Sequence, residues 1–587
     1  MIEKTYRAPI RITNENLSVQ EKVNYFIARF NYFLSNAGIS FQFDVESQLS
    51  LLEKVDFQIK GNLDNCVTYV DEYFKNPLFD NEELWENYSL FTELKKYIND
   101  YDNSPPNTSS KNHKKGILMG SGFHEVLEKL IVELKDKMAD NLGEDLISVF
   151  QCEYPLTEHD HIYKLNLLAQ LIISGGFFSK KTNAEVNEII ERIFRKGKDF
   201  PYPPDVKTGE ERKAYWDEGL LSNQIKGFTS LLRRDTASEI IITKLYGAEL
   251  PTDFEYEYDG VKFLGIDHPM ISQVKKGINK KLEEIFEPGE YIFISVPLKV
   301  FSDISIFEKI VEATKNQIRY FSSRLGYQFM LDQKKNFIVI DNDLRIVSYR
   351  LSLNRRKTVN PFQLEDLLNG TTEILKNEKG TLLANWFLEK EHLFTNALTS
   401  VVMSDLWIYI EALLPSTLLP EGVRIKELVS TIMLIEEEKE QQERIITQLT
   451  MTFTNYNGHE LLGIDYNELR RIEIALDQHE IPDEIRKVND PFVKELLIEF
   501  DKPLDSIYLN KAKEYYSSML TEAYGNRNSY VHQGLNNDAV VIKLEKTLPY
   551  LIARFRWILI DAIKLNLRLS PDELLTKLYA EGKLLLS

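Results

Sequence analysis

Apolar residues recur along the chain at two spacings, and each spacing predicts one kind of secondary structure. In Val23–Phe30, Phe123–Met138 and Ile162–Ile173 they recur every three or four residues, as on one face of a helix. Residues 1 to about 100 mix short strand-like pieces with helices, clear strand patterns follow from about residue 250, and from about residue 383 the helical spacing continues to the end. We therefore predict a mainly α fold with a central α/β or α+β module.

The central module is predicted from short apolar segments with the period of a strand. Phe254–Tyr258 alternates between apolar and acidic residues and ends at Asp259-Gly260, a dipeptide typical of hairpin turns. Tyr291–Val296 is almost entirely apolar, as expected for a buried strand. A helix is predicted over Ile306–Phe321. A second hairpin, formed by Asn336–Ile340 and Leu344–Tyr349, completes the module.

Polar stretches between these segments predict loops and helix ends. Tyr101–Asn112 and Gly197–Gly219 are rich in polar residues and proline, as in linkers or exposed loops. Glu436–Glu440 is read as a solvated helix face. Ser570-Pro571-Asp572-Glu573 has the serine, proline and glutamate of a capped helix start. The chain then divides into four regions. Residues 1–100 are a mixed or helical N-terminal region, and 117–249 are a helical region. Residues 250–382 are an α/β module considered for sensing or RNA binding, and 383–587 are a helical domain.

The composition indicates an acidic protein without membrane segments. The chain has 587 residues, with 71 Lys or Arg and 90 Asp or Glu, so the net charge is 71 − 90 = −19. No apolar run approaches the roughly 18 residues that span a bilayer, and the first residues lack a signal-peptide pattern. Cys66 and Cys152 are too few for a disulfide framework, so we expect packed thiols in a reducing cytoplasm.

This negative charge restricts how the protein can meet a nucleic acid. An acidic surface repels polyanions, so RNA would have to bind a local positive patch. The densest basic stretch has the composition for contacting phosphates and stacking bases, and equally that of a charged sheet edge that blocks aggregation. Both interpretations stay open for its residues, which are Arg345, Tyr349, Arg350, Arg355, Arg356 and Lys357.

Candidate metal ligands do not converge in the sequence. Glu158-His159-Asp160-His161 contains ligand-type side chains, but neighbouring residues of a helix point in different directions. No partner motif follows at a fixed distance. We read this segment as a polar loop before the helix at Ile162, and we expect no metal or cofactor.

The segment Tyr524–Gly534 combines a fixed cation, an amide and an imidazole. Arg527 presents a planar fork of donors suited to phosphate, and His532 has an ordinary pKa of about 6.5. Asn528 and His532 are four residues apart, so on a helix Asn528 can hold the imidazole in one tautomer. Arg527 and His532 are five apart, about 140° around the helix, so a compact site is expected from two copies meeting in a symmetric dimer.

A second helical pattern follows this segment. Its apolar face is predicted to pack the domain or to extend the dimer contact. The residues of this face are Leu548, Leu551, Ile552, Phe555 and Leu559.

Arg527-Asn528-x-x-x-His532 resembles the R-x(4–6)-H signature of the HEPN superfamily. Upstream, Leu406–Leu414 resembles an early HEPN helix. The residue pattern of Tyr524–Gly534 is similar to that of the ApeA-like HEPN group of phage-defence proteins. The resemblance covers roughly the last 200 residues. It implies a C-terminal HEPN-like helical bundle that acts as a dimeric, metal-independent endoribonuclease.

The resemblance also implies roles for individual residues. His532 would deprotonate the ribose 2′-OH or protonate the leaving 5′-oxygen, and Arg527 would stabilise the phosphorane, giving a 2′,3′-cyclic phosphate. Independently of the resemblance, Glu411 lies in an apolar run on a helix that should be largely buried, so it is expected to neutralise an arginine or to border the site. Tyr530 is expected to support the site. The implied substrate is tRNA or another RNA, and the implied role is growth arrest in phage defence, with a phage-derived trigger or regulatory partner at the N-terminal regions. The alternative is a non-catalytic HEPN-like scaffold that dimerises and binds a partner.

Overall fold

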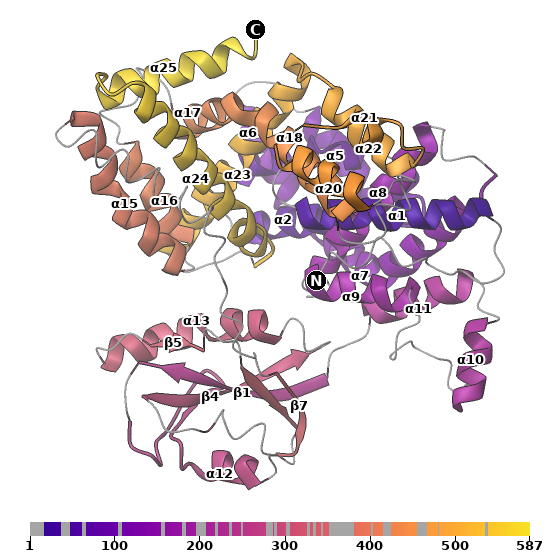
Figure 1. The fold of residues 1–587 in the computed structure, drawn as a ribbon, viewed down its shortest axis with the longest axis vertical. Coiled ribbons are helices and arrows are strands. Elements are labelled where there is room, and N and C mark those ends of the chain that lie inside the picture. The colour runs from indigo at the N-terminus through magenta and orange to yellow at the C-terminus, as the bar shows by residue number, and fades with distance from the viewer. Residues whose placement is uncertain are drawn as a thin grey trace. The chain divides into compact units, whose positions relative to one another are not determined.

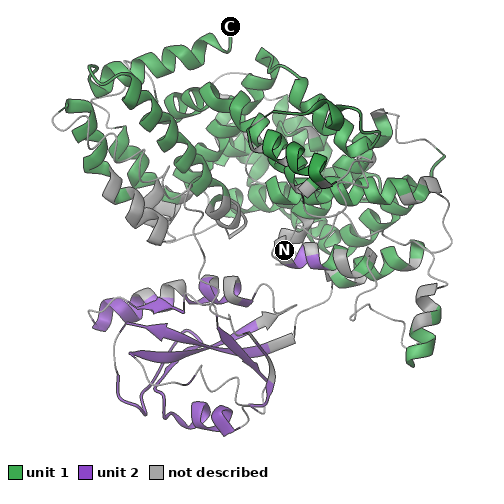
Figure 2. Ribbon diagram, viewed as in Figure 1, with its two compact units in different colours: residues 1–180, 189–232, 367–587 green, residues 181–188, 233–366 purple. Residues whose placement is uncertain are grey.

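The protein is mostly helical and divides into two compact units (Figures 1 and 2). Unit 1 comprises residues 1–180, 189–232 and 367–587, and unit 2 comprises 181–188 and 233–366. The computed structural model describes residues 17–36, 47–60, 66–80, 82–103, 108–153, 159–178, 183–194, 207–217, 221–233, 237–247, 250–276, 286, 290–300, 306–325, 329–332, 336–341, 344–350, 381–400, 403–414, 424–454, 466–478, 480–533 and 538–587.

The N-terminal part of the chain is helical throughout its described residues up to Arg233. Its elements are α1 (Leu17–Asn36), α2 (Gln48–Lys60), α3 (Cys66–Phe74), η2 (Pro77–Phe79), α4 (Glu82–Trp85), α5 (Phe91–Asp102), α6 (Thr108–Leu118), α7 (Ser121–Gln151), α8 (His159–Phe178), α9 (Asn183–Phe194), α10 (Gly209–Asp217) and α11 (Leu221–Arg233). α1 lies along α8, and α2 packs on α3 and α7. The predicted helices at Val23, Phe123 and Ile162 are confirmed as parts of α1, α7 and α8.

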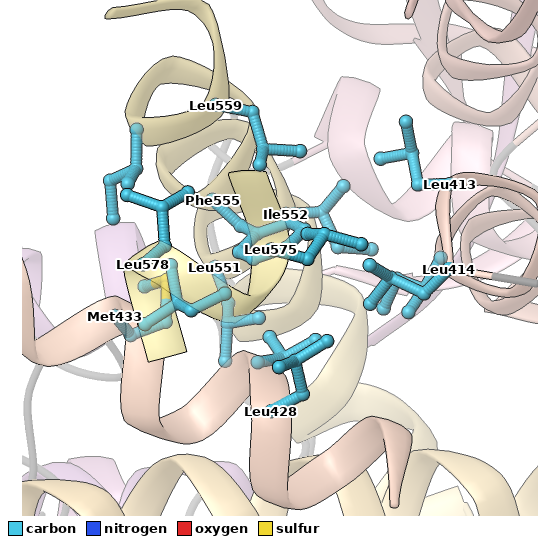
Figure 3. Close-up of a cluster of buried hydrophobic side chains, with 14 of the residues drawn as sticks. Leu413, Leu414, Leu428, Met433, Leu551, Ile552, Phe555, Leu559, Leu575 and Leu578 are labelled. Atoms are coloured by element: carbon cyan, nitrogen blue, oxygen red, sulfur yellow. The ribbon is translucent and has the colours of Figure 1, made fainter. Parts of the chain in front are cut away.

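The C-terminal part of the chain is helical, with elements α15 (Leu382–Ser400), α16 (Met403–Leu413), α17 (Ile425–Ile432), η4 (Met433–Glu436), α18 (Glu437–Thr454), α20 (Tyr466–Asp477), α21 (Asp483–Arg486), α22 (Pro491–Asp501), α23 (Ser506–Gln533), α24 (Asp538–Leu565) and α25 (Pro571–Leu584). One hydrophobic core is formed by residues of α15, α16, α17, η4, α23, α24 and α25 (Figure 3). Leu413 of α16, Leu428 of α17, Leu551 and Phe555 of α24, and Leu575 of α25 are buried together. The predicted apolar face of α24 therefore packs the domain. Each such side chain contributes about 1.5–3 kcal/mol by leaving water.

Unit 2 is an antiparallel sheet with a helix on each face (Figure 1). It contains β1 (Ala237–Tyr246), β2 (Glu255–Tyr258), β3 (Val261–Leu264), α12 (Pro269–Lys276), β4 (Tyr291–Val300), α13 (Ile306–Leu325), β5 (Met330–Leu331), β6 (Phe337–Ile340) and β7 (Ile346–Arg350). The strand order is β2-β3-β4-β1-β6-β7, and β5 also pairs with β1. Along β4, Tyr291 and Phe293 face α12, and Ile292 and Ile294 face α13. Both faces of β4 are covered, which explains its nearly continuous apolar run.

Both predicted hairpins and the helix between them are confirmed. β2 and β3 pair across Asp259 and Gly260, whose φ angles of 51° and 76° are those of a type I′ turn. β6 pairs with β7 in the same antiparallel way. All described pairings are antiparallel, so the module is of the α+β type. β1, at the centre of the sheet, falls in the region 117–249 that was predicted to be helical.

Two predicted loops are helical over part of their length. In Tyr101–Asn112, α5 includes Tyr101, which is fully buried and donates a hydrogen bond to the carbonyl oxygen of Val67 at 3.0 Å. In Gly197–Gly219, α10 begins with a capping box that the sequence reading missed. The Thr208 N–H donates to Glu211 Oε2 at 2.8 Å, and the Glu211 N–H donates to Thr208 Oγ1 at 3.1 Å. α8 likewise begins at His159, before the expected start at Ile162.

In the C-terminal region, one predicted helix cap is confirmed and one predicted solvated face is partly wrong. The capping box at Ser570 and Glu573 is confirmed. The solvated face expected at Glu436–Glu440 is wrong at Glu437, which is fully buried. Glu437 Oε2 lies 3.1 Å from Nη2 of Arg554 and accepts a hydrogen bond from the Tyr516 hydroxyl at 2.6 Å. A buried carboxylate is tolerated when a cation and hydrogen bonds compensate its charge, and this network does so.

The two compact units do not follow the boundaries of the four regions predicted from the sequence. Residues 1–100 and 383–587 belong to one compact unit, because α1 and α2 pack on C-terminal helices. Arg29 of α1 donates to Glu499 of α22 at 2.9 Å, and both side chains are largely buried. The N-terminal helices therefore complete the fold of the C-terminal ones.

Candidate active site on helix α23

Arg527 lies near the C-terminal end of α23, next to α16. The helix extends to Gln533, so it continues through every position of the Arg527–His532 segment. Arg527 Nη2 lies 4.0 Å from Glu411 Oε2 of α16, and the two side chains are 27% and 37% exposed. This is a long, half-exposed ion pair, which contributes little to stability. The guanidinium is held by a carboxylate and still reaches solvent, as an arginine that binds phosphate must.

Trp407 fixes the carboxylate that pairs with Arg527. Its indole Nε1–H donates to Glu411 Oε1 at 2.8 Å from one turn earlier on α16. The indole is buried and also packs against Tyr524 of α23, with 5.3 Å between the ring centroids. Glu411 was expected to be largely buried and is half exposed instead, because it lies at the edge of the core formed by its neighbours Ile410 and Leu413.

The other predicted site residues are placed only by their backbone. Asn528, Tyr530 and His532 belong to the last turns of α23, and their side chains lie outside what the structure describes. The structure thus brings Arg527, Glu411 and Trp407 together. The imidazole's role and its orientation by Asn528 stay predictions.

Buried contacts with N-terminal helices fix α23 just before Arg527. Lys54 Nζ of α2 lies 2.7 Å from Glu522 Oε1, and their side chains are 1% and 6% exposed. A Cβ added to Gly525 would lie 2.6 Å from the hydroxyl oxygen of Tyr69 on α3, so a larger residue here would require the tyrosine side chain to shift. The sequence reading missed both contacts, because 468 positions separate Lys54 from Glu522 and no pattern joins them.

We expect the Lys54–Glu522 pair to be strongly coupled. In a double-mutant cycle with Lys54→Met and Glu522→Gln, each single substitution leaves one buried group without its partner, and the double variant removes both charges. The expected interaction energy is about 1–3 kcal/mol. Urea unfolding followed by circular dichroism measures it, with Lys96→Met on the exposed face of α5 as the control. Additive effects of the two substitutions would contradict the coupling.

One set of metal-type ligands does converge, in a place the sequence did not indicate. Ligand atoms of Asp56, His124 and Glu128 all lie within 4.8 Å of one another. Lys60 Nζ lies 2.8 Å from Asp56 Oδ2 and 3.0 Å from Glu128 Oε1. A lysine ammonium thus already compensates the two carboxylates, and we assign no metal to the cluster. The sequence feature that points to this cluster is the four-residue spacing of His124 and Glu128 on α7, which places both side chains on one face of the helix.

The basic stretch of unit 2 is described only in part. Arg345 and Tyr349 are exposed, and Tyr349 lies on β7, an edge strand of the sheet. Arg355, Arg356 and Lys357 lie outside the described residues, as does the side chain of Arg350. An exposed, charged edge suits both interpretations, so the choice between RNA contact and protection of the edge stays open.

Comparisons with known proteins do not add to this picture. The chain matches no known family model, no curated protein and no solved structure. Within the described residues, every helix is too short or too polar to pass through a bilayer.

Proposed function

We propose that the chain is a metal-independent endoribonuclease with its active site on the last turns of α23. The observation that carries the proposal is Arg527, a half-exposed arginine held beside Glu411 on a helix that continues through His532. The resemblance of this segment to the HEPN signature supplies the reaction. The defence role, as a toxic effector triggered by infection, belongs to the same proposal.

The two side chains have complementary roles in the proposed reaction. His532 takes the proton of the 2′-OH or gives one to the leaving 5′-oxygen, which typically accelerates a reaction by about 10²–10⁴. Arg527 stabilises the charge that builds on the phosphorane, and losing such a donor typically costs about 10²–10³. Asn528 orients the imidazole, and a variant lacking it should react at an intermediate rate.

Glu411 and Trp407 position the arginine in this scheme. The 2.8 Å hydrogen bond from Trp407 sets the carboxylate, and the carboxylate restrains Arg527. Glu411 also offsets part of the guanidinium charge, so a phosphate must compete with it. Together with the net charge of −19, this favours a selective enzyme over a tight, non-specific RNA binder.

Product ends test the reaction class directly. We expect the purified full chain to cleave tRNA or total RNA in excess EDTA, leaving 2′,3′-cyclic phosphate and 5′-hydroxyl ends, because the 2′-OH is the nucleophile. Sequencing of the ends, with and without phosphatase treatment, identifies the chemistry. Cleavage that stops with EDTA, or 3′-hydroxyl ends, would rule out this mechanism. An intact RNA pool together with stable capture of a partner would favour the scaffold alternative.

The active unit is proposed to be a homodimer in which two α23 segments face each other. Positions 527 and 532 are about 140° apart on a regular helix, so one protomer surrounds a phosphate poorly. A twofold axis beside the segment would supply the same residues from the second chain. We expect mixed Arg527→Ala and His532→Ala proteins to regain part of the activity after subunit exchange. Full activity of a species with monomeric mass at nanomolar concentration would overturn the dimer.

A further inference from the structure

A cysteine, a histidine and a lysine from three parts of the N-terminal region meet at the end of α7. Cys152 directly follows α7, His161 lies in the first turn of α8, and Lys22 lies on α1. Cys152 Sγ is 3.3 Å from His161 Nδ1 and 3.6 Å from Lys22 Nζ. A base and a cation beside a thiol are the surroundings in which cysteines react as nucleophiles.

Lys22 carries a buried charge that is compensated only by neutral acceptors. The residue is 1% exposed, and its ammonium donates to the carbonyl oxygens of Phe150 and Cys152 as well as to Sγ. Among the described residues, no carboxylate lies within ion-pair distance of it. Burying an ammonium without a counter-ion is costly. Among the described contacts of this ammonium, the thiol of Cys152 is the one that can lose a proton.

His161 Nδ1 is one of two acceptors that the thiol proton of Cys152 can reach, and the other is the carbonyl oxygen of Val149, 3.2 Å from Sγ. His161 is 5% exposed, and burial, followed by the charges of Lys22 and Lys164, lowers the pKa of its imidazole. The ring is therefore neutral at pH 7 and can accept at Nδ1. Nε2 is buried and has no hydrogen-bond partner within the described part of the chain. The thiol is thus the group on which this histidine can act.

We propose that Cys152, His161 and Lys22 form a reactive thiol site for small hydroperoxides. His161 Nδ1 takes the S–H proton while Sγ attacks the terminal oxygen of the hydroperoxide. The S–O bond forms as the O–O bond breaks, and the leaving alkoxide or hydroxide receives the proton from the imidazolium. Sulfur is oxidised by two electrons to a sulfenic acid, and the hydroperoxide is reduced to an alcohol or water. Lys22 balances the negative charge on sulfur during the step.

Access and selectivity follow from burial. Cys152 is half-buried between the exposed residues Gln151 and Glu153, so we expect a small reagent to reach it. The second cysteine, Cys66, is 1% exposed, and burial raises the pKa of its thiol. The chain therefore contains its own reference thiol, which should stay unmodified.

The test treats the folded full chain with hydrogen peroxide at pH 7 and traps sulfenic acid with dimedone. Peptide mass spectrometry then gives the rate at each cysteine. We expect labelling at Cys152 and little at Cys66. A free thiol is only a few per cent thiolate at pH 7, so Lys22→Met and His161→Gln should each lower the Cys152 rate by about tenfold. Lys111→Met, which removes an exposed lysine of α6, is the control and should change the rate less than about twofold.

Two results would overturn the proposal. One is a Cys152 that reacts no faster in the folded wild-type chain than in the same chain unfolded in urea. The other is a folded Lys22→Met protein that reacts at the wild-type rate. The comparison of folded and unfolded wild-type protein needs no substitution, so it decides the question even if Lys22→Met fails to fold.

Discussion

Replacing His532 or Arg527 by alanine is expected to lower RNA cleavage by about 10²–10⁴ and about 10²–10³, respectively. In the proposed reaction the imidazole transfers the proton and the guanidinium stabilises charge in the transition state, so the loss should appear in kcat. Arg527 pairs with Glu411 across a half-exposed contact, and its removal should leave stability almost unchanged. The measurement is the single-turnover rate on a defined RNA, together with the thermal melt of each variant.

Matched controls come from the same residue types elsewhere in unit 1. His113→Ala on α6 and Arg470→Ala on α20 remove exposed side chains and should keep the rate within about twofold of wild type. Overexpression gives an independent readout, since toxicity should disappear with His532→Ala and persist with His113→Ala. Folded, dimeric His532→Ala protein that still cleaves at the wild-type rate would refute the catalytic assignment.

Glu437→Ala is expected to destabilise unit 1 by about 3–5 kcal/mol, because it leaves Arg554 buried without its main counter-ion. The Glu437 and Arg554 side chains are 0% and 2% exposed. Burial and then Glu437 raise the pKa of the Tyr516 hydroxyl well above 10.0, so tyrosine is a neutral donor to the carboxylate and cannot replace its charge. Among the described residues, Glu440 is the other carboxylate within ion-pair distance of Arg554, 3.8 Å from its Nε. The urea midpoint of unfolding measures the loss.

The neighbouring residue supplies the control for this stability effect. Glu438 follows Glu437 on α18 but is exposed, so Glu438→Ala should change stability by less than about 0.5 kcal/mol. A combined Glu437→Leu and Arg554→Met variant removes both buried charges and should regain much of the lost stability. Equal effects of Glu437→Ala and Glu438→Ala would show that the buried network contributes nothing.

Sequence patterns predicted the elements of this fold better than their contacts. Hairpin turns and helix caps depend on neighbouring residues, so Asp259-Gly260 and Ser570 were identified correctly. The burial of Glu437 depends on Arg554, which lies 117 positions away, and a run of glutamates otherwise resembles a solvated face. β1 was missed for a similar reason, since its neighbours in the sheet are distant in sequence and its apolar run also fits a buried helix.

The candidate site was predictable to the same degree. Arg527 and Glu411 were identified from local sequence, and the structure brings them to within 4.0 Å of each other. No local pattern indicates that Trp407 holds Glu411 or that Lys54 anchors α23 at Glu522. These contacts are set by tertiary packing.

The pairing of first and last helices has a consequence for the order of events on the ribosome. Arg29 and Lys54 find their carboxylate partners 470 and 468 residues later in the chain. At about 5–20 residues per second, α1 and α2 emerge roughly 20–90 s before Glu499 and Glu522 have been synthesised. During that interval the faces of α1 and α2 that later pack on C-terminal helices stay uncovered. Translation that stops before α23 therefore releases a chain in which Lys54 lacks its carboxylate partner, and quality control can degrade such a chain.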